Sequence, residues 1–223
     1  MNNLVEIRRL TKTYVRGREK IEALHDITLD IPRGDFVALM GPSGSGKTTL
    51  LNLIGGLDTP TAGSIMVDGR RIDQLSRGEL ARWRAANVGF VFQFYNLLPV
   101  LSAQRNVELP LLLTNLSAAQ RRKHAEIALT LVGLHDRAKH KPRELSGGQE
   151  QRVAIARAIA ADPEIILADE PTGDLDSKAA EDVLELLSRL NKELRKTIVM
   201  VTHDPDAARY AHDTKVLDKG VLR

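Results

Sequence analysis

The sequence predicts an α/β protein whose centre is a mainly parallel sheet. Phe36–Met40 and Val88–Phe92 have the length and continuous apolar character of strands that are buried on both faces. Residues 4–40 and 58–73 are rich in strand and turn signals, which predicts an N-terminal antiparallel β subdomain. Residues 94–136 are apolar without strand alternation, so we expect an α-helical lobe inserted between the core strands.

The composition is that of one folded domain. The chain has 223 residues, 43% hydrophobic and 27% charged, which is enough for a core with an inserted lobe. Aromatic residues make up only 4%, so we expect no nucleic-acid partner read by base stacking. The net charge of +3 fits an anionic ligand, a membrane surface or a solvated exterior equally well. The chain has no cysteine, which excludes disulfides, thiolate metal sites and cysteine nucleophiles.

No segment is expected to direct the chain into a membrane. Residues 1–6 lack a basic segment followed by an apolar one, so we expect no signal peptide. No apolar run approaches the ~20 residues that a membrane span needs. Any membrane role should therefore depend on a partner.

A phosphate-binding loop follows the first apolar run. The pattern G-x-x-x-x-G-K-[ST] is met by Gly41, Pro42, Ser43, Gly44, Ser45, Gly46, Lys47 and Thr48. The glycines let the backbone curl so that its N–H groups face phosphate oxygens. Lys47 can reach the β- and γ-phosphates, and Thr48 can place its hydroxyl on Mg²⁺. A Gly/Ser-rich surface turn is the alternative, but a strand before and a helix after the loop favour a P-loop NTPase core, with the helix N-terminus aimed at the phosphates.

Two carboxylates end another apolar run, at Asp169 and Glu170. Asp169 can hold hydrated Mg²⁺ opposite Thr48, and Glu170 can orient or deprotonate the attacking water. Alternatively, both acids favour the start of the next segment electrostatically. Two acids at the end of a buried strand beside a phosphate loop are costly without a cation, which favours the metal site.

Two further polar residues follow core strands, at the edge where α/β folds bind ligands. Gln93 comes directly after Val88–Phe92, although an ordinary strand exit explains it equally well. The imidazole of His203 could touch the γ-phosphate, although on its own it would be an ordinary loop histidine. The remaining histidines show no metal-binding spacing; they are His25, His124, His135, His140 and His212.

Polar caps predict the longer helices. Ser117 opens a capping box, and Gly133 closes the helix that follows. Asp176 or Ser177 can cap a helix that runs to about Leu194.

Ser146 can cap a helix over about residues 150–161, and Gly147 and Gly148 precede that helix. The glycines are either a flexible pair or a second anion-binding helix start.

In their order along the chain, these elements resemble the ATP-binding cassette (ABC) family of ATPases. The similarity covers nearly the whole chain, including a signature made of Leu145, Ser146, Gly147, Gly148 and Gln149. It implies a single cassette with a nucleotide-binding core at about residues 1–93 and 162–223 and a helical lobe at about residues 94–161. It also implies a head-to-tail dimer, in which the signature of one protomer closes over ATP held by the phosphate loop of the other.

The resemblance adds roles for single residues. Tyr14 would stack on adenine, although a half-buried strand aromatic is the alternative. Gln93 would contact Mg²⁺ and the junction with the lobe. Thr49 and Asp176 would be further nucleotide contacts.

A narrower likeness is to the macrolide-exporter and lipoprotein-release cassettes, and the cell-division cassettes are similar too. It is carried by residues 55–58, 92–99, 106–108 and 168–173. The group often has Asn at the position of Asp174, so this chain carries an extra negative charge near the dimer interface.

The resemblance implies a peripheral subunit that hydrolyses ATP with Mg²⁺ at the cytoplasmic face of the inner or plasma membrane. It would drive a separate transmembrane permease subunit, for export or for lipoprotein or lipid extraction. The alternative is a nucleotide-gated scaffold or a mechanotransmission ATPase of the cell-division type with little transport.

The resemblance also concerns the apolar residues 94–113, which Pro99 and Pro110 interrupt. They could all pack inside the lobe. In the family, however, this region receives a short helix of the membrane subunit. We therefore predict that part of residues 94–101 is exposed as a docking patch.

Overall fold

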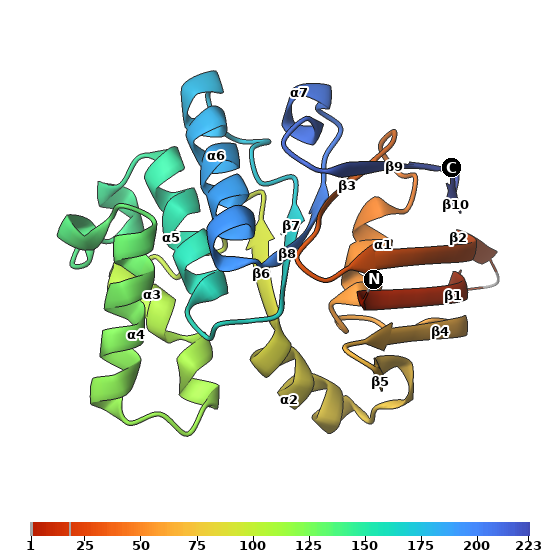
Figure 1. The fold of residues 1–223 in the computed structure, drawn as a ribbon, viewed down its shortest axis with the longest axis horizontal. Coiled ribbons are helices and arrows are strands. Elements are labelled where there is room, and N and C mark those ends of the chain that lie inside the picture. The colour runs from red at the N-terminus through yellow and green to blue at the C-terminus, as the bar shows by residue number, and fades with distance from the viewer. Residues whose placement is uncertain (1, 18) are drawn as a thin grey trace.

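The computed structural model describes residues 2–17 and 19–223. Met1 and Arg18, which fall within the predicted core range, lie outside the described residues. An antiparallel sheet lies at one end, a mainly parallel sheet in the middle and a group of helices at the other end (Figure 1). That group consists of α3 (Ala103–Glu108), α4 (Ala118–Leu131) and α5 (Gly147–Ile159).

The central sheet has the strand order β10-β9-β3-β8-β7-β6. Its strands are β3 (Phe36–Met40), β6 (Val88–Phe92), β7 (Ile165–Asp169), β8 (Thr197–Val201), β9 (Asp213–Asp218) and β10 (Val221–Leu222). Only the pairing of β10 with β9 is antiparallel, which confirms the predicted mainly parallel sheet. Phe92 pairs with Asp169 and Asp169 with Val201, so the carboxyl ends of β6, β7 and β8 meet at one edge.

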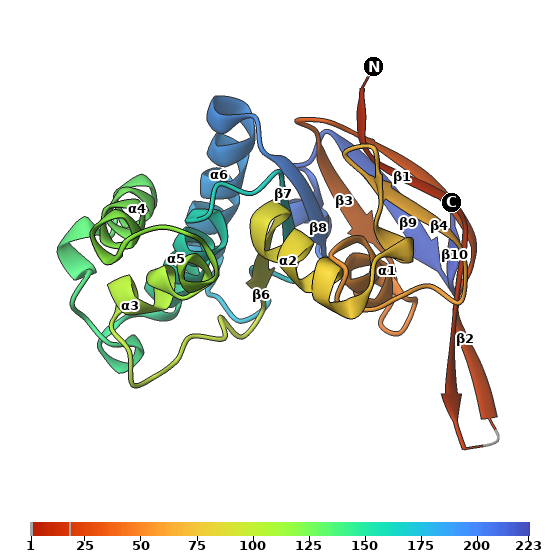
Figure 2. The ribbon, with the colours of Figure 1, turned by 90° about the horizontal axis from the view of Figure 1, so that it is seen from below.

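The N-terminal sheet is antiparallel, as predicted, with the order β2-β1-β4-β5. Its strands are β1 (Asn3–Arg16), β2 (Glu19–Pro32), β4 (Ala62–Val67) and β5 (Arg70–Arg71). Ile27, Leu29 and Ile31 of β2 are buried while the residues between them are exposed, because alternate strand residues point to opposite faces. The outer part of the β1–β2 pair extends beyond the rest of the protein (Figure 2).

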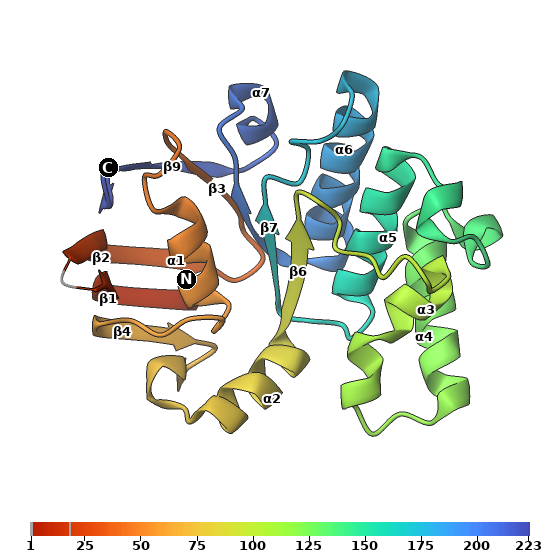
Figure 3. The same cartoon turned by 180° about the vertical axis from the view of Figure 1, so that it is seen from behind.

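The central sheet is buried on both faces, which explains its continuous apolar strands. On β8, Ile198 and Met200 belong to the hydrophobic cluster shared with the helices of the lobe. Val199 and Val201 belong to the cluster shared with the antiparallel sheet. Helix α1 (Lys47–Ile54) packs within this second cluster, between the two sheets (Figure 3).

The remaining helices connect these layers. They are α2 (Arg77–Asn87), α6 (Ser177–Leu194) and α7 (Pro205–Ala208), with 3₁₀ turns at Ile72–Gln74, Pro110–Leu113, His135–Arg137 and Pro142–Glu144. None of the helices in the described ranges is long and apolar enough to cross a bilayer.

The caps agree with the sequence at two helices and correct it at a third. The predicted capping box at Ser117 is present, and Asp176 rather than Ser177 caps α6. The prediction that α5 starts at about Glu150 was wrong, because the helix begins at Gly147. Ser146 and Gln149 form a capping box, and its reciprocal hydrogen bonds draw both glycines into the first turn.

The boundary of the helical lobe remains a prediction. Helices α3, α4 and α5 do lie within residues 94–161. Yet Val153, Ile155 and Ala156 of α5 share one hydrophobic cluster with residues of the central sheet. The lobe and the core are therefore joined by continuous packing.

Candidate nucleotide-binding site

A cavity of about 710 Å³ opens at the carboxyl edge of the central sheet. The chain connections place the phosphate loop after β3, Gln93 after β6, Glu170 after β7 and His203 beyond β8. The cavity is lined by Ala23, Pro42, Ser43, Gly44, Ser45, Gly46, Lys47, Thr48, Thr49, Gln93, Glu170, Val201 and His203. The structure thus brings most of the predicted site residues together.

The phosphate loop has the backbone of an anion-binding turn. Gly46 is the N-cap of α1 at φ +102°, and a Cβ there would lie 2.5 Å from the Ala23 carbonyl oxygen, so only glycine fits. No side chain caps α1 and no acid lies in its first turn, which leaves its N–H groups for an anion. The buried hydroxyl of Ser45 has no hydrogen-bond partner within the described residues. The loop therefore offers donors that a phosphate would satisfy.

Lys47 places its charge inside this loop. Its side chain is buried, and its Nζ donates to the carbonyl oxygens of Gly41 and Pro42 at 2.7 and 3.0 Å. Both carbonyls belong to the loop itself, so the ammonium stays where phosphate oxygens would lie.

Thr48 and Asp169 meet as a pair of oxygen donors. Thr48 Oγ1 donates to Asp169 Oδ1 at 3.1 Å. Burial raises the pKa of Asp169 and the neighbouring Glu170 charge acts in the same direction, while the Thr48 hydrogen bond opposes both. A carboxylate whose charge is disfavoured in this way gains from a bound cation. Hydroxyl and carboxylate oxygens suit Mg²⁺, which keeps several waters and uses few protein ligands, so the residues fit the ion.

Glu170 lies beside His203, a contact that the sequence did not predict. Glu170 leaves the strand at φ +48°, and its N–H donates to the Val201 carbonyl oxygen at 2.9 Å. His203 Nδ1 lies 2.9 Å from Glu170 Oε1. Because a carboxylate only accepts, the imidazole donates through Nδ1 and its Nε2 is free to face a ligand.

Gln93 lies against the segment that follows Glu170. A Cβ at Gly173 would lie 3.0 Å from Gln93 Nε2, so any larger residue there would push the Gln93 side chain aside. Gln93 therefore touches both the cavity and the loop leading to α6.

Comparison with known proteins identifies the family. Residues 24–173 match the family described as ABC transporter. The chain belongs to this family. It is an ATP-binding cassette, as the sequence resemblance suggested.

Its relatives include cassettes of similar length and larger transporters. The uncharacterized ABC transporter ATP-binding protein MJ0796 of Methanocaldococcus jannaschii is 50% identical over 97% of this chain and 94% of that protein. A dimeric, post-hydrolysis structure of MJ0796 bound to ADP and Pi matches with a TM-score of 0.89 at 48% identity, covering 98% of this chain and 97% of that one. The macrolide export ATP-binding/permease protein MacB of Marinobacter nauticus is 48% identical over 93% of this chain but only 32% of its own length.

Several predicted nucleotide contacts of this cassette lie outside the cavity lining, as far as the described residues show. They are Tyr14, Gly41, Ser146, Gly147, Gly148, Gln149 and Asp176. Asp176 Oδ1 accepts the Ala179 N–H at 2.8 Å, so the capping alternative is realised. The hydroxyl of Tyr14 donates to Asp58 at 2.9 Å, and Lys12 Nζ lies 4.8 Å from its ring centroid. Their roles toward a nucleotide remain predictions.

Arg157, which was not among the predicted site residues, holds the turn after Gln93. Its guanidinium donates to the carbonyl oxygens of Tyr95, at 2.7 Å, and Asn96. Both residues have positive φ, so the turn is fixed in a conformation that side chains disfavour. Burial lowers the pKa of Arg157. Arg157 could have been identified from the sequence as an arginine within the apolar stripe of a helix.

Asp174 is tied into the same region. The hydroxyl of Tyr95 lies 3.3 Å from Asp174 Oδ2 and 3.4 Å from its carbonyl oxygen. Burial and the Asp174 charge raise the pKa of Tyr95 to about 12. The Tyr95 hydroxyl is thus the hydrogen-bond donor to the Asp174 carboxylate, which carries the extra negative charge noted in the sequence.

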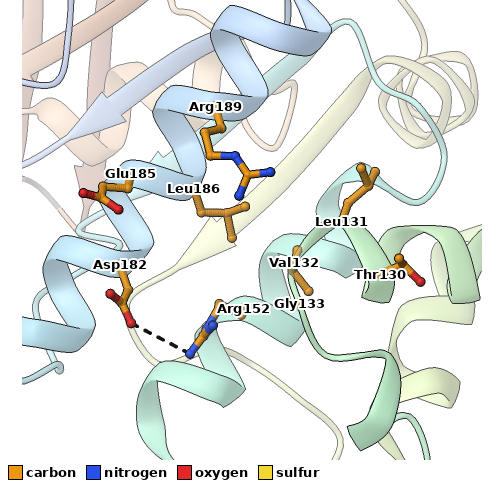
Figure 4. Close-up of a pocket in the computed structure, with 9 residues that line it drawn as sticks. All are labelled: Thr130, Leu131, Val132, Gly133, Arg152, Asp182, Glu185, Leu186 and Arg189. Atoms are coloured by element: carbon orange, nitrogen blue, oxygen red, sulfur yellow. Dashed lines mark ion pairs between the residues drawn. The ribbon is translucent and has the colours of Figure 1, made fainter.

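A separate hollow of about 340 Å³ lies between α4, α5 and α6 (Figure 4). Arg152 faces Asp182 across it, with Nη2 and Oδ2 4.0 Å apart. No residue of the phosphate loop lines this hollow, so it is not part of the nucleotide site.

Proposed function

We propose that this cassette hydrolyses ATP with Mg²⁺ and drives a separate membrane subunit, working as an ATP-dependent homodimer. The observation that carries the proposal is the position of Glu170 and His203, 2.9 Å apart, beside the phosphate loop in one cavity. These are the groups that phosphoryl transfer to water needs: a place for the phosphate charge and an acceptor for the proton of the water.

The roles follow from the positions of the side chains. The N–H groups of the loop and Lys47 stabilise the phosphate charge, and Thr48 with Asp169 would hold Mg²⁺. Bound there, the ion would neutralise developing charge on the phosphate oxygens. Glu170 accepts the proton as the water attacks, while His203 keeps that carboxylate oriented through Nδ1 and faces the γ-phosphate with the rest of its ring.

A membrane partner is supported by the surface next to the site. Phe94, Leu98 and Val100 are 68%, 46% and 75% exposed, which confirms that part of residues 94–101 faces solvent. Nearby, a groove of about 460 Å³ is lined by residues that include Leu57, Phe92 and Leu113. We propose that a short helix of the membrane subunit docks here.

The likeness to the macrolide export protein MacB supports export as the process that is driven. Lipoprotein or lipid extraction is the other process that the sequence resemblance implies. We accordingly propose that the protein works peripherally, at the cytoplasmic face of the inner or plasma membrane. The second candidate is a nucleotide-gated scaffold, or a mechanotransmission ATPase of the cell-division type with little transport. A measured turnover rate separates the scaffold from the ATPases.

Glu170→Gln tests the proposal. It should keep ATP binding, lose about 10²-fold or more in hydrolysis and accumulate as a dimer with ATP by light scattering, because a positioned general base contributes on that scale. Glu164→Gln is the matched control, since Glu164 precedes the same strand and pairs with Arg33 instead. Near-normal turnover in Glu170→Gln would assign the base to another residue, and absent turnover in the unaltered protein would favour the scaffold.

A further inference from the structure

Gln151 is a fully buried amide in the second turn of α5. Its Nε2 donates to two backbone carbonyl oxygens, those of Phe92 at 3.2 Å and Pro171 at 2.5 Å. The two acceptors are far apart in the sequence but lie at the ends of neighbouring strands, β6 and β7.

These carbonyls flank the residues assigned to the chemistry. Phe92 immediately precedes Gln93, and Pro171 immediately follows Glu170. The last pair of the β6–β7 ladder joins Phe92 to Asp169, so strand pairing does not continue into the segments that follow. The amide of Gln151 bridges these two segments and fixes the backbone of both where the strand hydrogen bonds end.

One end of this amide is left without a partner in the described part of the chain. Its Oε1 is buried and finds no hydrogen-bond partner within residues 2–17 and 19–223. A buried acceptor without a partner is unfavourable, and native proteins keep few of them. An apolar side chain of the same size would fill the space without that cost but could not hold the two carbonyls.

Gln151 also belongs to the helix that carries the signature. It lies two residues beyond Gln149, on the same first turns as Ser146 and its capping box. A Cβ on Gly148 would lie 2.9 Å from Ala179, so this part of α5 is closely packed on α6. If the start of α5 moved, the side chain of Gln151 would therefore transmit the movement to the loops that follow β6 and β7.

We propose that Gln151 is a positioning residue that couples the signature helix to the loops carrying Gln93 and Glu170. This inference rests on the proposed ATPase function. In the dimer, the signature of one protomer would contact the nucleotide of the other. Through Gln151 and the carbonyls of Phe92 and Pro171, that contact would set the position of Glu170 in the protomer that carries the signature.

Gln151→Met is the decisive variant, because it keeps the volume and removes the donor. We expect kcat to fall roughly tenfold to hundredfold, the scale of a small misplacement of catalytic groups, with KM for ATP nearly unchanged. Asn191→Leu is the matched control. Asn191 is also a buried amide, and it donates to the carbonyl oxygens of Gly34 and Lys196, both at 2.9 Å. These carbonyls lie at the opposite edge of the sheet, away from the nucleotide site. It should lower the melting temperature and leave kcat unchanged.

A second readout does not depend on turnover. Amide hydrogen exchange should be faster at residues 93–96 and 172–174 in Gln151→Met and unchanged there in Asn191→Leu. If the unaltered protein shows no hydrolysis, the proposed function fails while this exchange comparison still decides the coupling. If Gln151→Met does not fold, Gln151→Asn keeps an amide too short to reach both carbonyls and should give the same loss. Wild-type kcat with wild-type exchange in a folded variant would overturn the proposal.

Discussion

Lys47 concentrates positive charge at the phosphate loop. Its ammonium is buried and donates to the loop carbonyls of Gly41 and Pro42. A phosphate oxygen is a better acceptor than a neutral carbonyl, because both partners of the hydrogen bond are then charged. The residue is thus placed to exchange backbone partners for a nucleotide.

Lys47→Ala should weaken ATP binding roughly tenfold to hundredfold, because one charge-assisted contact is worth ~1.5–3 kcal/mol. Isothermal titration calorimetry measures this directly. Lys196→Ala is the control. Lys196 Nζ also donates two hydrogen bonds, to the carboxylate of Asp162 and the carbonyl of Pro163, but it lies away from the loop. Equal affinities for the two variants would show that Lys47 does not bind phosphate.

At the scale of elements, the segment between β6 and α3 is fixed at its backbone and exposed at its side chains. The buried amide of Asn106 accepts the Leu98 N–H at 2.7 Å and donates to the Leu98 carbonyl at 3.2 Å. The side chain of Leu98 remains 46% exposed. An apolar segment held in place beside Gln93 is suited to receive a partner and to respond to the nucleotide.

Leu98→Glu should abolish co-purification with the membrane subunit while the melting temperature and basal ATPase rate stay nearly unchanged, because a charge is introduced on a docking surface and not in the core. Ile127→Glu is a suitable comparison, since Ile127 is 51% exposed on α4. It should retain the partner. Unfolding of Leu98→Glu would instead make Leu98 a core residue.

At the scale of the whole molecule, one chain carries two helix starts suited to anions. Lys47 opens α1 inside the cavity, whereas Ser146 caps α5 and is not among the described residues that line it. A nucleotide in this cavity would leave the signature unused within the same chain. A second copy, placed head to tail, would bring the signature to the nucleotide.

Ser43→Cys combined with Ser146→Cys tests that arrangement, because these would be the only thiols in the chain. ATP should promote an intermolecular disulfide, which requires Cα atoms within ~7 Å, and non-reducing electrophoresis would detect it. Pairing Ser43→Cys with Ser117→Cys is the control, because Ser117 is an exposed capping-box serine of α4 and its loss weakens a cap equally. Crosslinking that ignores nucleotide would contradict the dimer.

The sequence by itself determined the local units. The strand before the phosphate loop, the helix after it and the caps at Ser117 and Asp176 depend on residues a few positions apart, so pattern and chemistry suffice to predict them. The acidic pair Asp169 and Glu170 was identified because charges at the end of a buried strand are unfavourable unless a cation or another partner compensates them.

Only the tertiary structure decided which of these units meet. The contact of Glu170 with His203 depends on the pairing of β7 with β8, and the bridge from Gln151 to Phe92 depends on how α5 packs at the end of β6. No local pattern encodes such contacts, because they join residues that are distant in the chain and are fixed by sheet register and helix packing. The exposure of Leu98 was likewise settled by packing, since an apolar residue is compatible with a core and with a docking surface alike.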